Sequence, residues 1–131
     1  MLEAVVPGRD GPDELLVKGY LTALSAGRFL DALNAFSMDA SFRDESGRER
    51  HGIREIAAAF ARRERPLRVE IEDLRQEGDI VLVRVRMSFP ENRTPKIYRS
   101  VFHVRRDRID SLEIEPLPTS RTKKDRLART A

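Results

Sequence analysis

The amino-acid sequence predicts one α+β domain in which about three N-terminal helices cover the concave face of a curved, mostly antiparallel β-sheet. Apolar residues recur with helical spacing in the first half of the chain, whereas a period of two dominates from Arg68 to Glu115. This segregation is typical of helices packed on one face of an antiparallel sheet. With 131 residues, the chain is long enough for one compact domain and too short for two.

The N-terminal part is predicted to contain a flexible leader and two helices. Residues 1–12 hold prolines and glycines without a sustained period. Pro12, followed by two acidic residues, favours a helix start, and Gly27 favours its end. A shorter helix is predicted from about Arg28 to Phe36. The face of the first helix that we expect to be buried comprises Leu15, Leu16, Gly19, Tyr20, Ala23 and Leu24.

A short strand and a third helix follow. Alternation over Ala40 to Asp44 predicts a strand that places Ala40, Phe42 and Asp44 on one face, so that a carboxylate shares the side of apolar residues. Apolar spacing then predicts a helix over Gly52 to Arg63, which Pro66 ends.

The remaining elements are predicted to be strands of a meander. Turn residues separate them at Glu77–Asp79, Pro90–Pro95 and Arg106–Asp107. The expected strands are one that contains Val69 and Ile71, a long one from Val81 to Phe89, one from Ile97 to Arg105 and a short one from Ile109 to Glu115. A curved sheet closed by helices makes a cone with an apolar interior, which is the usual geometry of a small-molecule pocket.

Charge and composition limit the classes of partner. The chain carries a net charge of +3, but residues 116–131 hold five basic residues against Asp125, a net +4, so the rest carries about one negative charge. We therefore expect one domain over 13–117 and a basic, disordered tail over 118–131, and we expect no nucleic-acid partner. The chain has no cysteine and no apolar run that could span a membrane, so we expect no membrane partner and a cytoplasmic location.

Asp44 and Tyr20 are the candidate catalytic residues. A carboxylate on the inward face of a strand loses hydration and becomes a better general base, and a buried phenol needs a hydrogen-bond partner. Together they suffice for proton abstraction next to a carbonyl, with Asp44 as base and Tyr20 as oxyanion donor. A structural interpretation stays open beside this one: Asp44 is a turn former before Ser46 and Gly47, and Tyr20 is a packing residue.

The order of elements and the segment FSMDASFRDESGRERHGIREIAAAF resemble the NTF2-like superfamily, specifically its SnoaL-like and ketosteroid-isomerase-like members. The resemblance spans about Asp13 to Glu115. It rests on Asp39-Ala40, on Phe42-Arg43-Asp44 and on the Gly-x-x-x-Ile helix start at Gly52 to Ile56. It implies an NTF2-like cone, a short hairpin after the aspartate, the isomerase's general base at Asp44 and its oxyanion tyrosine at Tyr20. No cofactor is implied.

The chain departs from the isomerase pattern at three positions. The isomerase's second oxyanion donor falls on Phe102, and two supporting tyrosines fall on Phe36 and Phe60. Loss of one such donor costs about 10²- to 10³-fold in rate. The substitutions make the pocket more apolar, so Phe36, Phe42, Phe60 and Phe102 are expected to bind a hydrophobic small molecule, unless they form ordinary core.

Two further expectations concern other surfaces and another class of function. Arg84, Arg86, Arg99 and Arg105 lie on one face of the predicted sheet, and the resemblance implies a homodimer through this outer face. His51 and His103 lack the spacing of a metal motif, so no metal is expected. Two functions stay open: an isomerase or polyketide-cyclase-like enzyme acting next to a carbonyl, and a non-catalytic ligand-binding or dimeric adaptor domain.

Overall fold

The computed structural model of the chain describes residues 11–62, 68–90 and 92–118. Most of the predicted leader (1–12) and of the predicted tail (118–131) lies outside these ranges, so the domain limits of 13–117 stay a prediction. In chain order, the helices and strands are α1 (Pro12–Ala26), α2 (Phe29–Asn34), β1 (Phe36–Arg43), β2 (Glu49–His51), α3 (Ile53–Arg62), β3 (Arg68–Glu77), β4 (Ile80–Phe89), β5 (Asn92–Arg105) and β6 (Arg108–Leu117).

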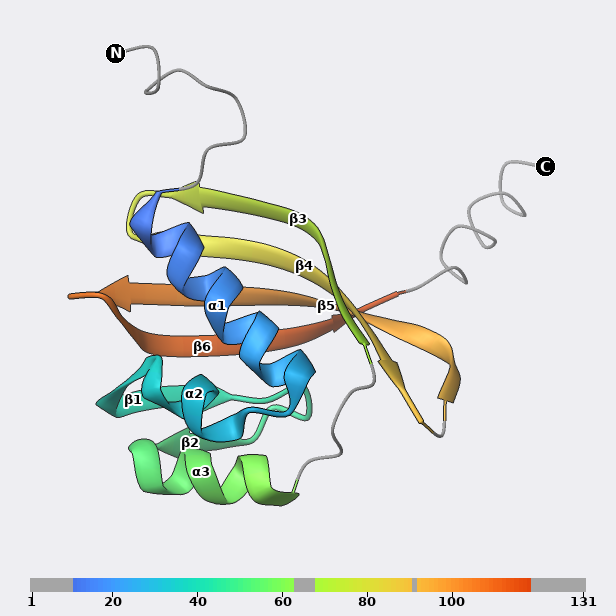
Figure 1. Ribbon diagram of the computed structural model, residues 1–131, viewed down its shortest axis with the longest axis horizontal. Coiled ribbons are helices and arrows are strands. Elements are labelled where there is room, and N and C mark those ends of the chain that lie inside the picture. Colours follow the sequence, from blue (N-terminus) through green and yellow to red (C-terminus); the bar gives the residue numbers. More distant parts are fainter. Residues whose placement is uncertain (1–10, 63–67, 91, 119–131) are drawn as a thin grey trace, which may run out of the picture.

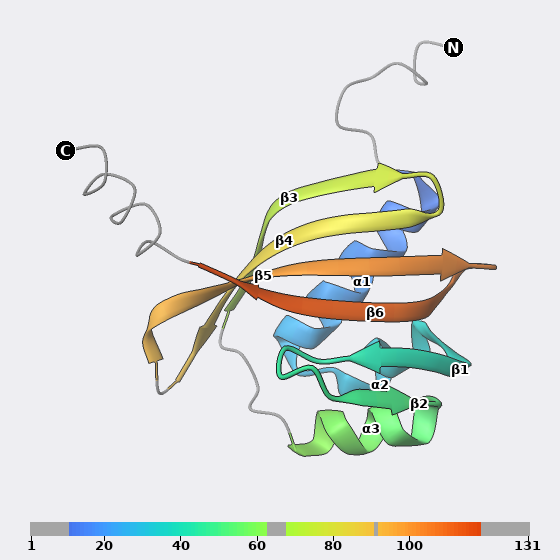
Figure 2. The same cartoon turned by 180° about the vertical axis from the view of Figure 1, so that it is seen from behind.

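The strands form one curved sheet in the order β2-β1-β6-β5-β4-β3. Neighbouring strands are antiparallel except β1 and β6, which are parallel. The helices lie on one face: α1 begins beside the end of β3 and crosses in front of β4, β5 and β6, and α3 packs on β1 and β2 (Figure 1). None of the described helices lies on the opposite face of β3 to β6 (Figure 2). The predicted α+β class and mostly antiparallel sheet are confirmed.

The buried face of α1 differs from the predicted one. Val17, Tyr20, Leu21 and Ala23 are buried, whereas Leu15 is 57% exposed. At about 100° per residue, Leu15 lies on the opposite side of the helix from the stripe centred on Val17 and Leu21. Gly19 lies on that exposed side as well. The correction rotates the contact face of α1 but leaves Tyr20 inside the core.

The boundary between α2 and β1 also differs from the prediction. The helix ends at Asn34, and Phe36 already opens β1, four residues before the predicted strand start at Ala40. The Ile109 backbone N–H donates to the Ala35 carbonyl at 2.7 Å, and Phe36 pairs with Ile109. This contact with β6, distant in sequence, ends the helix earlier than local periodicity indicates.

At its other end, β1 stops at Arg43, and Asp44 lies in the turn that leads to β2. The three-residue strand β2 pairs with the end of β1, and the two strands form the short hairpin that the resemblance implied. Gly52, with φ of 87°, then connects β2 to α3, where the backbone conformation favours glycine. None of the helices in the described part of the chain is long and apolar enough to cross a membrane.

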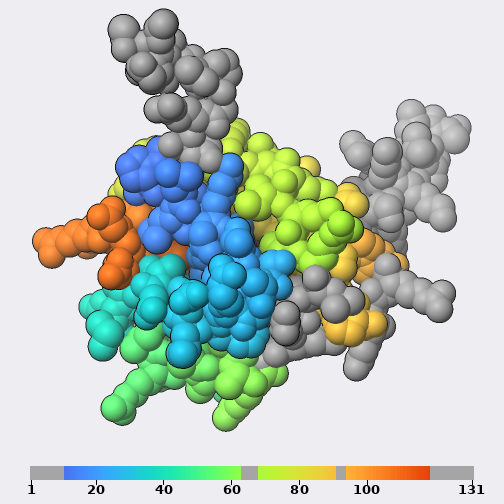
Figure 3. Space-filling view, viewed as in Figure 1, coloured from blue at the N-terminus to red at the C-terminus, as the bar shows by residue number. Residues whose placement is uncertain are grey.

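The core lies between the helices and the inner face of the sheet. Val81, Val83, Val85 and Met87 alternate along β4 and are buried there, in the strand predicted from Val81 to Phe89. In a space-filling view from the helical side, α1 and α2 cover the middle of the molecule (Figure 3). Tyr20 and four phenylalanines, Phe36, Phe42, Phe60 and Phe102, are all buried and form the aromatic centre of this core.

Candidate functional site

The interior of the cone contains a small cavity of about 20 Å³. Its walls come from α1, β1, α3, β4, β5 and β6, so every layer of the fold contributes to it. A single water molecule needs roughly 10–15 Å³ of such space, so the aromatic side chains fill most of the interior themselves. The lining residues are Tyr20, Leu21, Leu24, Phe42, Phe60, Met87, Ser100, Phe102, Leu112 and Ile114.

Tyr20 packs at the centre of the aromatic cluster. Its ring meets Phe36 edge-on at a centroid distance of 5.4 Å and Phe102 at 5.8 Å. Phe60 lies 6.4 Å away. Of the four phenylalanines predicted to bind a ligand, Phe42, Phe60 and Phe102 line the cavity. Phe36 does not line it but contacts the ring of Tyr20. The predicted apolar surroundings of Tyr20 are therefore present, and the ring is held by T-shaped contacts.

Ser100 is a lining residue that the sequence analysis missed. Ser100 is 4% exposed and is the one buried polar residue in the core formed by the described residues. It lies on β5 between Tyr98 and Phe102, which are both buried on the same inner face. Alternation through Phe102 could have identified Ser100, because residues two positions apart on a strand share a face.

Asp44 is held in the turn between β1 and β2. Its Oδ1 accepts hydrogen bonds from the Ser46 backbone N–H at 3.0 Å, the Ser46 hydroxyl at 2.6 Å and the Arg48 backbone N–H at 3.1 Å. Its Oδ2 lies 3.8 Å from Nη2 of Arg50. This is the arrangement of an aspartate that stabilises a tight turn.

The charge of Asp44 is stabilised in this position. Burial acts to raise the pKa of the carboxyl, but the hydrogen bonds from Ser46 and Arg48 and the positive charge of Arg50 outweigh it. The pKa of Asp44 therefore lies below its ordinary value of 3.8. A general base works best with a pKa near the working pH, so this shift lowers the basicity that proton abstraction would need.

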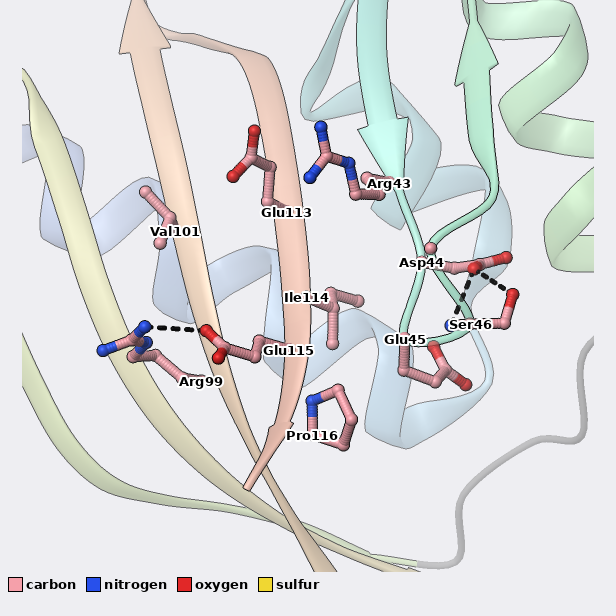
Figure 4. A pocket seen from close by; sticks show the side chains of 11 residues that line it. Arg43, Asp44, Glu45, Ser46, Arg99, Val101, Glu113, Ile114, Glu115 and Pro116 are labelled. Carbon is pink, nitrogen blue, oxygen red and sulfur yellow. Dashed lines mark hydrogen bonds and ion pairs between the residues drawn. The ribbon is translucent and has the colours of Figure 1, made fainter. Parts of the chain in front are cut away.

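Asp44 and Tyr20 line two different spaces formed by the described residues. Tyr20 lines the interior cavity, whereas Asp44 lines a groove of about 340 Å³ between β6 and the β1–β2 turn. Figure 4 shows the Asp44 carboxylate directed at Ser46 within the turn, with β6 on the other side of the groove. Ile114 lines both spaces and so separates the groove from the interior.

Several charged residues of the groove and of the outer sheet face pair within the chain. Arg99 binds Glu115 at 2.7 Å, and Arg43 binds Glu49 at 3.0 Å. On the neighbouring strands, Arg86 binds Glu72 at 2.8 Å. The arginine stripe predicted on this face is present, and three of the arginines that face outward have carboxylates of the same chain as partners. Exposed pairs of this kind contribute about 0–1 kcal/mol each.

Both histidines are exposed. Nδ1 of His51 lies 3.4 Å from the Ser41 hydroxyl, and its Nε2 lies 3.6 Å from Glu49. His103 lies on the outer face of β5. Within residues 11–62, 68–90 and 92–118, no group of three or more histidine, aspartate or glutamate side chains could hold a metal ion.

Comparison with known proteins identifies relatives in both sequence and fold. The family model of the SnoaL-like domain matches residues 17–111. No protein among the curated sequences matches the chain. An NTF-2-like protein of unknown function from Burkholderia xenovorans is 17% identical, with 86% of this chain and 91% of that chain covered and a TM-score of 0.71.

Two other solved structures are similar to the chain. An LEH-like epoxide hydrolase of M. tuberculosis is 21% identical, covers 81% of this chain and 83% of its own, and gives a TM-score of 0.69. A protein with a ketosteroid-isomerase-like fold from Catenulispora acidiphila, solved in complex with trimethylamine, is 19% identical, with coverages of 76% and 82% and a TM-score of 0.65. At these identities the likeness shows the fold alone.

Proposed function

Because the chain belongs to the family of SnoaL-like domains, we propose that it binds one small, uncharged and mainly apolar molecule in the cavity at the centre of its cone. The observation that carries this proposal is the composition of the cavity wall. Aliphatic and aromatic side chains surround two hydroxyl-bearing residues, Tyr20 and Ser100. Apolar walls with a few polar groups are the usual make-up of small-molecule sites.

The same wall argues against a charged ligand. The residues that line the cavity include no arginine, lysine, histidine, aspartate or glutamate. An ion placed there would lose its hydration without gaining a counter-ion, which is strongly unfavourable. Neutral compounds with a hydrocarbon body are therefore the expected ligand class.

A ligand must enlarge the cavity, because about 20 Å³ holds no more than one water-sized group. Leu24 and Ile114 are only half-buried and form the part of the wall nearest the surface. Met87 is an unbranched, adaptable side chain that can repack at low cost. We propose that these three side chains move to admit the ligand, while the aromatic cluster around Tyr20 stays in place. The need to open the site predicts weak, millimolar binding of small probes.

Proton-transfer catalysis with Asp44 as base and Tyr20 as oxyanion donor stays a separate hypothesis. It requires the Asp44 carboxylate to leave three hydrogen bonds in the β1–β2 turn and to reach the interior cavity. Ligand binding without this chemistry needs no such rearrangement. We therefore favour a ligand-binding domain over an isomerase or cyclase.

A homodimer through the outer sheet face also stays a proposal. Val101 and Leu82 face outward side by side on β5 and β4 and are only half-buried. They offer a small apolar centre, and the ion pairs of Arg86 and Arg99 lie around it. An apolar centre with a charged rim fits a protein interface.

Ligand binding is tested by NMR titration of the protein with cyclohexanone, with cyclohexanecarboxylate as the charged control. We expect cyclohexanone to shift the amide signals of residues that line the cavity, and the carboxylate to leave them unchanged. Leu24→Trp should fill the entrance and abolish the shifts. Leu30→Trp is the matched control, because Leu30 lies on α2 and is 78% exposed. No cavity shifts with cyclohexanone, or shifts that survive Leu24→Trp, would refute binding at this site.

Catalysis is tested with cyclohex-3-enone, a β,γ-unsaturated ketone, by following the absorbance of the conjugated product. We expect no turnover above the buffer rate. Turnover that disappears in Asp44→Asn would instead establish Asp44 as the base and overturn our preference for a non-catalytic domain.

A further inference from the structure

We propose that Ser100 is the polar anchor of the cavity and donates its hydroxyl hydrogen to an oxygen atom of the ligand. This inference rests on the proposed ligand-binding function and narrows it to one chemical class: neutral molecules that carry a carbonyl or ether oxygen on a hydrocarbon body. The site of contact is the inner face of β5 at the cavity wall.

The first observation is that the Ser100 hydroxyl makes no hydrogen bond to the residues that the structure describes, although the residue is only 4% exposed. The hydroxyl oxygen is not fully enclosed by these residues, so it keeps some accessible surface. Buried polar groups in folded proteins nearly always have a partner, and each exception calls for an explanation. An alanine at this position would bury the same strand face without an unsatisfied donor. The hydroxyl is therefore available to donate a hydrogen bond to a molecule in the cavity.

The second observation is where the hydroxyl lies. Ser100 lines the cavity together with Phe102, its neighbour on the same face of β5, and with Met87. Val83 pairs with Ser100 across the strands and offers only hydrocarbon. Apart from Tyr20, the side chains around Ser100 in the cavity wall are apolar, so its hydroxyl helps to orient a bound molecule.

The third observation is the absence of charge in the cavity wall noted above. A hydroxyl donor without a neighbouring cation favours a neutral acceptor over a carboxylate. Because the wall provides no further charged partner, one oxygen atom on the ligand is enough to satisfy the site. Ketones, ethers and aldehydes meet this requirement, whereas pure hydrocarbons and acids do not.

The test compares two probes of the same shape, cyclohexanone and methylenecyclohexane, in which a CH₂ group replaces the carbonyl oxygen. The dissociation constants of both are measured by NMR titration on the wild-type protein, on Ser100→Ala and on Ser111→Ala. Ser111 lies on β6 and does not line the cavity, so its variant controls for a serine change on a strand. Ser100→Cys, with nearly the volume of serine and a much weaker donor, serves as a second variant.

The measured quantity is the dissociation constant of the alkene divided by that of the ketone. We expect this ratio to be about fivefold larger in the wild-type protein and in Ser111→Ala than in Ser100→Ala. The alkene itself should bind Ser100→Ala at least as well as it binds the wild type. Ser100→Cys should lose most of the preference for the ketone. These results would establish Ser100 as the residue that selects oxygen-bearing ligands.

Two other outcomes separate the two proposals. If both probes bind in the cavity and the ratio of their dissociation constants is the same in Ser100→Ala and the wild type, the anchor is refuted while ligand binding stands. If neither probe binds the wild-type protein, the ligand-binding function fails, and the inference about Ser100 fails with it.

Discussion

Asp44 and Arg50 face each other across the β1–β2 hairpin, with Oδ2 3.8 Å from Nη2 and exposed side-chain fractions of 13% and 15%. The contact is long for an ion pair, and Nη1 of Arg50 is buried with no hydrogen-bond partner in the described part of the chain. The stronger constraint on Asp44 is the set of three hydrogen bonds at its other oxygen. Asp44 is therefore fixed mainly by the turn that it stabilises.

Replacing Asp44 should lower stability through this turn. Asp44→Ala removes the acceptor of three hydrogen bonds and is expected to reduce the free energy of unfolding by about 1–3 kcal/mol. Asp44→Asn keeps a carbonyl oxygen that can accept the same bonds, so its loss should be smaller. Urea unfolding at pH 7 measures both. Equal losses in the two variants would contradict this assignment, since they would place the stabilisation in the negative charge and not in the turn geometry.

The lowered pKa of Asp44 gives the fold a defined acid dependence. Because the pKa in the folded state lies below the ordinary 3.8, the charged carboxylate stabilises the protein above about pH 4. This contribution is lost as the pH falls through the folded pKa. The difference in unfolding free energy between the wild type and Asp44→Asn should therefore be largest near neutral pH and shrink below about pH 4. Urea midpoints between pH 7 and pH 2.5 measure it, and a constant difference over that range would refute the assignment.

Arg50 should contribute little net stability, despite its burial. Its guanidinium is largely removed from water, yet it gains only a long contact with Asp44 and leaves Nη1 unsatisfied. Removing one member of a buried ion pair is costly when the other is left uncompensated, but Asp44 keeps its three hydrogen bonds within the turn. We expect Arg50→Met to change the free energy of unfolding by no more than about 1 kcal/mol. Arg99→Met, in an exposed pair with Glu115, is the control and should also have a small effect. A loss of about 3 kcal/mol or more in Arg50→Met would show a tightly coupled buried pair.

The fold could be predicted to the level of its elements because the two halves of the chain differ in period. The alternation through Val81, Val83 and Val85 identified both the strand and its buried face. The boundary at Phe36 could not be predicted, because the hydrogen bond from Ile109 to Ala35 joins residues far apart in sequence. Such contacts override local propensity, and only the folded chain reveals them.

The candidate site was predictable only in part. Tyr20 lies in the core as expected, because a helix stripe can be recognised from spacing. The position of Asp44 depended on whether the strand ended before or after it, and one residue decides between the sheet and the turn. Alternation with Phe102 could place Ser100 on the inner face of its strand, but that pattern alone gives a serine no functional role. Its significance comes from the cavity beside it, which depends on the packing of six separate elements.

Two glycine substitutions should change stability in opposite directions. Gly19 lies in the interior of α1 with φ in the helical region, and an added Cβ would meet nothing within 4 Å. Gly19→Ala should therefore stabilise the protein by about 0.5–1 kcal/mol. Gly47 has φ of 88°, a conformation that disfavours side chains, so Gly47→Ala should destabilise by about 1–2 kcal/mol. Thermal unfolding of both variants provides the measurement, and shifts of the same sign would contradict it.

The outer sheet face gives a test of assembly. Val101 lies opposite Leu82 on β4 and Glu113 on β6, so it occupies the centre of this face. If two copies pack through the face, Val101→Asp places a charge in a desolvated interface, where it has no partner. We expect the wild-type protein to sediment as a dimer at micromolar concentration, and Val101→Asp to sediment as a folded monomer. Leu30→Asp, on the exposed side of α2, is the matched control and should remain dimeric. A dimer that persists in Val101→Asp would place the interface elsewhere. A monomeric wild-type protein would refute assembly, and the ion pairs of this face would then be ordinary surface contacts.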